Sequence, residues 1–153
     1  MMKIIFVCHG NICRSPMAEY IMKDLVRKAG RESEFEISSA AVSYEEEGNP
    51  IYPPAARMLQ GKGVPYSAHA AHRITSGEAS EADLIVVMDC SNRRLLGKII
   101  DSADVPKVHY MMEYAGCGCR DVADPWYTGD FSRAYEDILA GCQGLLSYTA
   151  KAC

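Results

Sequence analysis

Residues 3–16 read KIIFVCHGNICRSP, and this stretch decides how the rest of the chain is interpreted. Its first part, Lys3–Val7, is an apolar run typical of a buried β-strand. A short loop follows, and then Ser15 and Pro16, which favour the N-cap and the first turn of a helix. The stretch therefore predicts a strand, a tight loop and a helix N-terminus in direct succession.

The predicted loop, residues 8–15, has the composition of an anion-binding site that includes a nucleophile. Ligands of open α/β sheets bind beyond the carboxyl ends of the strands, and main-chain N–H groups at a helix N-terminus attract anions. Gly10 permits the tight curvature that turns N–H groups inward, and Arg14 offers a planar fork for two phosphoryl oxygens. Such surroundings favour the thiolate of Cys8, which is the nucleophilic form of cysteine. We therefore expect a reactive thiol beside a site for a tetrahedral dianion.

Outside this stretch the chain alternates between strand and helix patterns. The predicted strands are residues 35–39, 82–88 and 105–111, and the predicted helices are residues 15–29, 55–62, 91–100 and 130–151. Ser91 is the predicted cap of the third helix, and residues 43–54 and 117–129 are predicted as irregular segments. The pattern predicts a single α/β domain over residues 1–153, doubly wound, with a central four-stranded parallel sheet in the order 2-1-3-4 and helices on both faces.

Composition narrows the classes of function. The net charge of −4 predicts no general affinity for nucleic acid or for acidic membranes. No apolar run approaches the roughly 18 residues of a membrane span, and the first residues do not resemble a signal peptide. The odd count of seven cysteines argues against a disulfide scaffold: Cys8, Cys13, Cys90, Cys117, Cys119, Cys142 and Cys153. We therefore expect a cytoplasmic protein with reduced thiols.

Several motifs follow one another along the chain and identify a family. They are residues 8–19 (CHGNICRSPMAE), Ser39-Ala40-Ala41, Gly48-Asn49-Pro50, Met88-Asp89, Ser91-Asn92 and Asp124-Pro125-Trp126-Tyr127. Together they resemble the low-molecular-weight protein tyrosine phosphatases over the whole length of the chain. The resemblance implies an enzyme that hydrolyses phosphotyrosine monoesters through a phosphocysteine intermediate on Cys8, with no cofactor and no metal.

The resemblance also implies roles for individual residues. Arg14 binds the phosphoryl group, and Asp124 is the general acid and then the general base, which an aryloxide leaving group requires. Asn11 and Ser15 hold the loop in shape and hydrogen-bond the thiolate, and His69 supports the loop. The remaining residues of the phosphate-binding loop are His9, Gly10, Ile12 and Cys13. Asp89 is expected to be structural.

The rim of the site is predicted from the residues that follow these motifs. Trp126 and Tyr127 are expected to form an aromatic wall for the substrate ring, together with Glu47, which favours phosphotyrosine over the shorter phosphoserine. The acidic run Glu45–Glu47 is either a solvated surface or a device that disfavours acidic phosphopeptides by like-charge repulsion. Tyr127 also matches a family tyrosine that a tyrosine kinase can phosphorylate.

Two rival enzymes use the same fold and loop. An arsenate reductase needs two further cysteines close together to relay a disulfide; Cys90 has no second cysteine nearby in sequence, since Cys117 and Cys119 come much later. In a protein-arginine phosphatase the residue before the second loop cysteine tends to be threonine, so Ile12 favours tyrosine phosphate. A metal held by Cys117, Cys119 and His109 is not expected, because a lone C-x-C lacks a second pair of ligands.

A third alternative is a redox-responsive phosphotyrosine-binding module without turnover. As in the family, Cys13 is expected to pair with Cys8 in a disulfide that protects the nucleophile from over-oxidation. The presence of both Cys8 and Asp124 argues against a lapsed enzyme. One position departs from the family pattern: His72 stands where arginine is usual, so contacts near the site are expected to differ.

Overall fold

The computed structural model describes residues 1–151 and contains a four-stranded sheet with the strand order β2-β1-β3-β4. All three neighbouring pairs are parallel. The strands are β1 (Met2–Cys8), β2 (Phe35–Ala41), β3 (Leu84–Val87) and β4 (Val108–Tyr110). The predicted fold class and strand order are confirmed. Cys153 lies outside the described residues.

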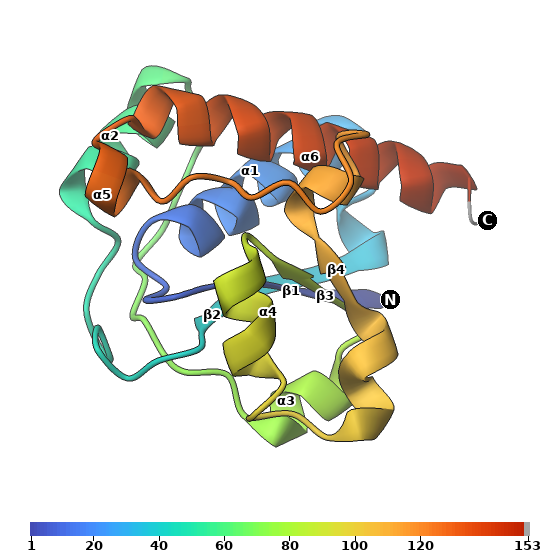
Figure 1. Cartoon of the computed structure of the whole chain (residues 1–153). Helices are drawn as coiled ribbons and strands as arrows, with labels where there is room; N and C mark the ends of the chain where they lie inside the picture. The colour runs from blue at the N-terminus through green and yellow to red at the C-terminus, as the bar shows by residue number, and fades with distance from the viewer. Residues whose placement is uncertain (152–153) are drawn as a thin grey trace.

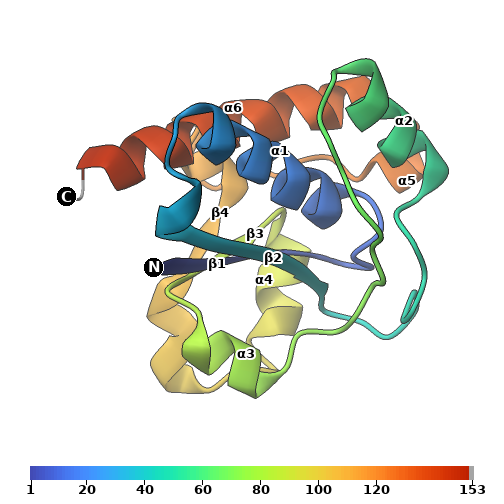
Figure 2. The same ribbon diagram turned by 180° about the vertical axis from the view of Figure 1, so that it is seen from behind.

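Helices cover both faces of this sheet, as Figure 1 and the reverse view in Figure 2 show. One face carries α1 (Arg14–Lys28), α2 (Pro53–Gly61), α5 (Pro125–Thr128) and α6 (Phe131–Lys151). The other face carries α3 (Ser76–Glu81) and α4 (Cys90–Leu96). Three short 3-10 helices complete the fold: η1 (Glu32–Glu34), η2 (Ser102–Lys107) and η3 (Met111–Glu113). Within residues 1–151 no helix has the length and apolar character needed to cross a bilayer.

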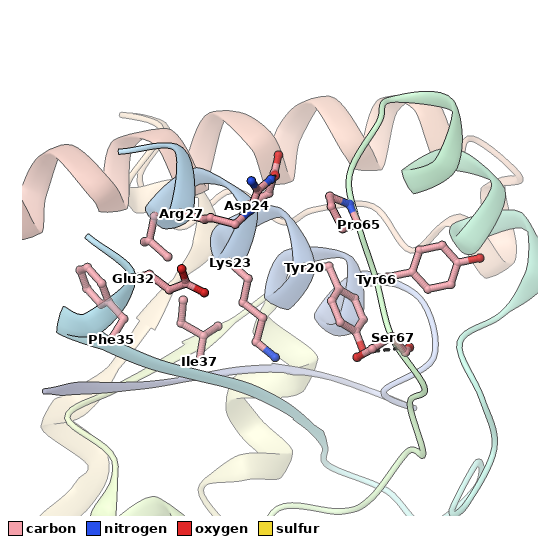
Figure 3. A pocket seen from close by; sticks show the side chains of 11 residues that line it. Tyr20, Lys23, Asp24, Arg27, Glu32, Phe35, Ile37, Pro65, Tyr66 and Ser67 are labelled. Atoms are coloured by element: carbon pink, nitrogen blue, oxygen red, sulfur yellow. Dashed lines mark hydrogen bonds and ion pairs between the residues drawn. The ribbon is translucent and has the colours of Figure 1, made fainter. Parts of the chain in front are cut away.

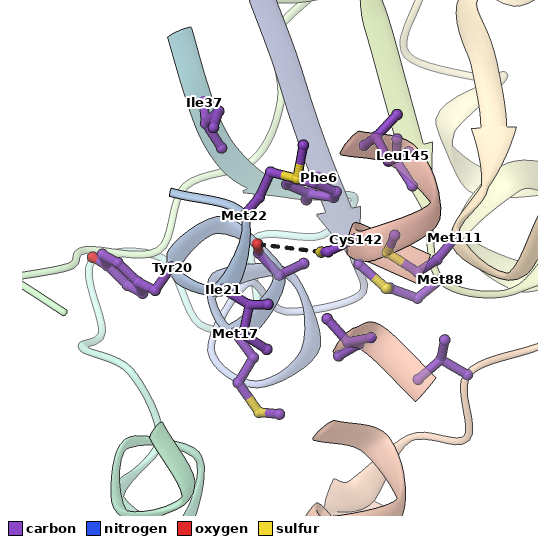
Figure 4. Packing of buried hydrophobic residues seen from close by; sticks show 14 of the residues in the cluster. Phe6, Met17, Tyr20, Ile21, Met22, Ile37, Met88, Met111, Cys142 and Leu145 are labelled. Atoms are coloured by element: carbon purple, nitrogen blue, oxygen red, sulfur yellow. Dashed lines mark hydrogen bonds between the residues drawn. The ribbon is translucent and has the colours of Figure 1, made fainter. Parts of the chain in front are cut away.

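The central strand β1 explains why the N-terminal run is apolar throughout. Ile4 and Phe6 lie in the buried cluster beneath α1 and α6, whereas Ile5 and Val7 lie in the cluster on the α3 and α4 side. Successive strand residues face opposite sides of a sheet, so a strand covered on both faces needs apolar residues at every position. Figure 4 shows Phe6 among side chains of α1 and α6, where the Cys142 thiol donates to the Ala18 carbonyl at 3.8 Å.

Two predicted helix caps are wrong. Ser15 does not cap α1, because that helix begins at Arg14 and its N-cap residue is Cys13. Ser91 does not cap α4, because the side chain of Asp89 accepts a hydrogen bond from the Asn92 N–H at 2.7 Å. In both helices the predicted serine lies inside the first turn.

Other differences concern the extent of elements. Strand β4 is shorter than predicted, because residues 102–107 with Pro106 form a 3-10 helix before it. Helices α3 and α5 were not predicted, although Thr75 and Glu78 form a capping box that is visible in the sequence. Strand β2 runs two residues further than predicted and brings Ala41 beside Cys8. The site loop therefore lies at the carboxyl ends of the sheet.

Candidate active site

The loop between β1 and α1 owes its shape to Asn11. Asn11 has φ of 61°, a left-handed conformation that asparagine tolerates better than most residues. The unusual backbone conformation that was expected at Gly10 is therefore found at Asn11, the next residue. What Gly10 supplies is space, since a Cβ atom there would lie 3.2 Å from Cγ of Glu46.

The main-chain N–H groups of this loop are available to an anion. The Asn11 N–H donates to Sγ of Cys8 at 3.3 Å. Among the residues that the structure describes, the other N–H groups of residues 9–15 have no hydrogen-bond acceptor. They lie at the N-terminus of α1, where the helix dipole adds partial positive charge. The loop therefore forms an anion cradle next to a thiol.

The thiol of Cys8 receives a second polar contact from Ser15. The two atoms, Sγ and Oγ, are 3.1 Å apart. Asn11 Nδ2 donates to the same Oγ at 2.8 Å, so the Ser15 hydroxyl can direct its own proton at the sulfur. Ser15 therefore contacts the nucleophile from inside the loop and does not cap the helix. Two donors stabilise negative charge on Cys8.

A buried polar network holds Asn11 in place. Its Nδ2 also donates to Ser39 Oγ at 3.0 Å, and Ser39 in turn donates to Glu19 at 2.6 Å. Its Oδ1 accepts from the His72 N–H at 3.3 Å. Nε2 of His69 donates to the Asn11 carbonyl oxygen at 2.7 Å, which is the loop contact expected of this histidine. Ser39 and Glu19 lie in the motifs quoted above, but those motifs do not predict their role in this network.

Arg14 is 2% exposed and binds three acceptors far apart in sequence. Its Nη1 donates to Asp89 at 2.7 Å and to the Val122 carbonyl at 2.8 Å, and its Nη2 donates to Asp124 at 3.3 Å. These contacts leave Nε–H and one Nη2–H of the guanidinium for an anion. Burial opposes the charge on Arg14, but Cys8, Asp124 and Asp89 outweigh it and raise the guanidinium pKa. Arg14 therefore stays cationic.

Asp124 faces Arg14 because it caps the short helix α5. One carboxylate oxygen accepts from the Trp126 N–H at 3.0 Å, and the other accepts from Arg14. Pro125 follows at the first position of the helix, where its missing N–H costs nothing. The cap fixes the carboxylate at the edge of the site.

A cavity of about 180 Å³ lies over the loop and collects most of the predicted site residues. Its lining comprises Cys8, His9, Gly10, Ile12, Cys13, Arg14, Glu45, Glu46, Asp124, Trp126 and Tyr127. Glu47 is not among them, because its carboxylate accepts from the Arg73 N–H at 3.1 Å. The predicted place of Glu47 in the wall is taken by Glu45 and Glu46.

The aromatic side of this cavity has an unforeseen support in Tyr52. The rings of Tyr52 and Trp126 have centroids 4.8 Å apart, and Tyr52 also stacks on Phe131 at 6.0 Å. Trp126 is 50% exposed and Tyr127 is 84% exposed. Trp126 is therefore held at the rim by a neighbouring ring, while Tyr127 projects further into solvent.

Cys13 lines the same cavity but differs from Cys8 in its surroundings. Burial, with smaller contributions from Cys8 and Asp124, raises the pKa of the Cys13 thiol. Cys13 therefore remains a neutral thiol at neutral pH. Both Cys8 and Cys13 are unpaired.

A larger cavity of about 410 Å³ lies elsewhere, between α1, the start of β2 and residues 65–67 (Figure 3). Its charged lining balances, with Lys23 and Arg27 against Asp24 and Glu32, and none of its side chains is a cysteine or histidine. Lys23 is bound to Glu19 at 2.6 Å. The smaller cavity is therefore the candidate active site.

No metal centre is apparent in residues 1–151, because no three His, Cys, Asp or Glu side chains gather as ligands there. His109, considered above as a ligand, lies 3.1 Å from the carboxylate of Glu113.

Comparison with known proteins identifies the family. The model of the low molecular weight phosphotyrosine protein phosphatases matches residues 3–152. The chain belongs to this family. The predicted family and enzyme class are thereby confirmed: the protein is a low-molecular-weight protein-tyrosine phosphatase, a phosphoric monoester hydrolase.

Relatives of this phosphatase match it from end to end. YfkJ of Bacillus subtilis, a low molecular weight protein-tyrosine-phosphatase, is 32% identical over 99% of this chain and 97% of its own. The low molecular weight phosphotyrosine protein phosphatase of Schizosaccharomyces pombe is 33% identical over 97% of each chain. The crystal structure of YfkJ superposes with a TM-score of 0.94, covering 99% of this chain and 96% of that one. A Drosophila arginine phosphatase superposes with a TM-score of 0.87 at 29% identity, covering 97% and 98% of the two chains.

Proposed function

We propose that this phosphatase hydrolyses phosphotyrosine monoesters through a phosphocysteine intermediate on Cys8. The observation that carries the proposal is the cradle of N–H groups of residues 9–15, which surrounds a thiol stabilised by Asn11 and Ser15. A phosphoryl dianion satisfies those N–H groups, and the same contact brings its phosphorus to the sulfur.

In the proposed first step the Cys8 thiolate forms a bond to phosphorus while the bond from phosphorus to the aryl oxygen breaks. Asp124 gives its proton to the departing oxygen, which leaves as a neutral phenol. In the second step a water molecule gives a proton to Asp124 and attacks the phosphocysteine, which releases phosphate and restores the thiolate. The remaining N–H groups of Arg14 and the loop N–H groups bind the phosphoryl oxygens in both transition states. Cys13 is not consumed, and no cofactor takes part.

The walls of the cavity favour an aromatic phosphate. Trp126, held against Tyr52, offers a ring surface beside Asp124, where the leaving oxygen has to lie. A phosphoserine side chain is too short for its phosphate to reach the loop while the peptide backbone stays outside such a wall. The Drosophila relative acts on arginine phosphate by its name, which makes phosphoarginine the closest competitor to test.

Kinetics on a panel of substrates tests this assignment. The wild-type protein is assayed with one peptide sequence that carries phosphotyrosine, phosphoserine or phosphoarginine, and with arsenate plus thioredoxin. We expect kcat/KM for phosphotyrosine to exceed the other values by about 100-fold or more, as a pocket built for one leaving group can achieve. A preference for phosphoarginine, or reduction of arsenate without hydrolysis of aryl phosphate, would replace the proposal.

Replacing Asp124 by alanine tests the proposed general acid. We expect kcat for phosphotyrosine to fall by about 10² to 10⁴-fold, the usual contribution of a positioned acid. The loss should shrink for an aryl phosphate whose leaving group is itself acidic, because that oxygen departs without a proton. Asp101, an exposed residue at the start of η2, gives the matched control Asp101→Ala. An equal loss for acidic and basic leaving groups would remove Asp124 from this role.

The acidic rim is proposed to disfavour acidic phosphopeptides. Glu45 lies beside His9 at 2.9 Å and Glu46 accepts from Asn49 at 2.7 Å, so both carboxylates are held at the cavity mouth. In the double variant Glu45→Gln, Glu46→Gln we expect kcat/KM for acidic peptides to rise by about 2- to 5-fold per charge at low salt. For basic peptides kcat/KM should fall by a similar factor. The control Glu81→Gln changes an exposed residue that lines no part of this cavity, so it should leave kcat/KM unchanged for both kinds of peptide. Equal changes for both peptides would refute this role for the rim.

Two regulatory roles complete the proposal. Cys13 is the proposed disulfide partner of Cys8, and both thiols line one cavity. Tyr127 is the proposed target of a tyrosine kinase, which its high exposure supports. Phosphate on Tyr127 would place negative charge at the mouth of a site that binds anions.

A further inference from the structure

Three cysteines outside the phosphate-binding loop take no part in the proposed mechanism. Cys90 begins α4, and Cys117 and Cys119 lie in the segment after η3. All three are exposed and unpaired. Exposed thiols are the ones that oxidants reach, so their positions relative to one another matter.

The fold brings Cys90 to the segment that contains Cys119. The Val122 N–H donates to the Met88 carbonyl at 2.8 Å, which holds Val122 beside the end of β3. Asp121 accepts from the Cys90 N–H at 3.1 Å, and its second oxygen lies 3.9 Å from the Cys90 sulfur. Cys119 stands only two residues before Asp121. Tertiary contacts therefore bring the segment that contains Cys119 near Cys90, although the two cysteines are far apart in the sequence.

The residues that follow Cys119 are held by neighbouring elements. Arg120 donates to Asp137 of α6 at 3.0 Å, and Asp121 accepts from the Cys90 N–H. Cys119 lies in the turn before them, so its backbone is tied to the position of Asp121, two residues away.

Tyr110 gives an independent indication that the two thiols share a location. Its pKa is raised, first by partial burial and then by charge at Cys90, with further contributions from Cys119 and Asp121 that Arg93 partly offsets. Both cysteines therefore contribute to the electrostatic surroundings of one hydroxyl group at the end of β4.

The turn that carries Cys119 can adjust toward Cys90. The Cys117 carbonyl accepts from the Arg120 N–H at 3.3 Å, and Gly116 and Gly118 have φ of 79° and 62° on either side of Cys117. Glycine moves between such conformations at little cost. A disulfide needs Cα atoms about 4.4–6.8 Å apart, and an exposed turn built on two glycines is suited to reach that separation.

We propose that Cys90 and Cys119 form a second redox site, a dithiol that hydrogen peroxide converts to a disulfide. One thiolate attacks a peroxide oxygen and becomes a sulfenic acid as water is released. The second thiol then attacks that sulfur, the S–S bond forms, and a second water leaves. Two sulfurs are oxidised and one peroxide is reduced, so the electrons and protons balance.

This site differs from the loop pair in its consequence. A bond between Cys8 and Cys13 removes the nucleophile, whereas a bond between Cys90 and Cys119 leaves Cys8 free. It would join the start of α4 to the segment that supplies the Val122 carbonyl to Arg14. Residues 119–124 should therefore become less accessible to proteases while phosphatase turnover persists.

Mapping of disulfides after oxidation tests the proposal. Wild type, Cys90→Ser, Cys117→Ser and Cys119→Ser are treated with substoichiometric hydrogen peroxide, blocked with an alkylating agent, digested and analysed by mass spectrometry. Turnover of an aryl phosphate before oxidation verifies that each variant is folded. We expect a peptide pair linked by Cys90 and Cys119 in wild type and in Cys117→Ser, and its loss in the other two variants.

Several outcomes would overturn the assignment. A dominant bond between Cys117 and Cys119, a bond from Cys90 to Cys153 or to a second chain, or oxidation confined to Cys8 and Cys13 would each do so. The proposal does not rest on the phosphatase mechanism, so an inactive but correctly cross-linked protein would leave it standing.

Discussion

Replacing Cys8 with serine is expected to lower phosphatase turnover by about 10⁵ to 10⁶-fold, the order of loss seen when an enzyme loses its nucleophile. A serine hydroxyl stays protonated at neutral pH and has no nearby base in this loop. The side-chain contacts of Asn11 that shape the loop include no atom of Cys8, and a serine hydroxyl can still accept from the Asn11 N–H. Binding of the substrate should therefore survive the loss of chemistry.

Two measurements on Cys8→Ser separate these effects. Steady-state kinetics with a phosphotyrosine peptide gives the loss in kcat, and calorimetry with the same peptide gives its affinity. Cys90→Ser is the matched control, because its exposed thiol lies outside the cavity and should leave turnover unchanged. Wild-type turnover in Cys8→Ser would end the proposed mechanism. Tight binding without turnover in the wild-type protein would instead identify a phosphotyrosine-binding module.

The largest expected effect on stability comes from Gly144→Ala. In α6, a Cβ atom at Gly144 would lie 1.7 Å from the carbonyl oxygen of Tyr114 and 2.6 Å from its carbonyl carbon. These are backbone atoms, so the helix or the end of η3 has to move. Alanine gains about 1 kcal/mol in helix propensity, but we expect overpacking to reduce the free energy of unfolding by about 3 kcal/mol net.

Thermal and urea unfolding measure this loss, which corresponds to a fall in Tm of about 6–12 °C for a chain of this size. Gly61 provides the control, since it is also helical and nothing lies within 4 Å of a Cβ atom there. Gly61→Ala should leave stability unchanged or raise it slightly. Equal stability of Gly144→Ala and wild type would show that α6 can shift without cost.

Sequence patterns predicted the structures that depend on residues close together in the chain. They did not predict side-chain contacts between residues far apart in the chain. The run from Lys3 to Pro16 predicted the strand, the loop and the helix, because a strand that feeds an anion-binding helix is a local signal. The acceptors of Arg14 could not be predicted in this way. Asp89 and Val122 reach Arg14 only when the residues after β3 and the loop before α5 lie at the same edge of the sheet.

The errors have similar physical causes. Ser15 is a residue type that often caps helices, but here its hydroxyl group contacts Cys8 and accepts from Asn11 instead. Glu47 is predicted in the wall with Trp126 and Tyr127, yet its carboxylate accepts from the Arg73 N–H and does not line the cavity. Tyr52, which supports Trp126, carried no signal in sequence, because ring contacts between separate loops have no period.

The hydrogen bond between Arg14 and Asp124 has a consequence for the end of each reaction cycle. Asp124 takes one Nη2–H of the guanidinium, so a carboxylate lies beside the N–H groups that remain for a phosphate ion. When Asp124 is ionised, its charge opposes the charge of the phosphate left in the cradle. We therefore expect Asp124 to favour release of the product before the next substrate enters.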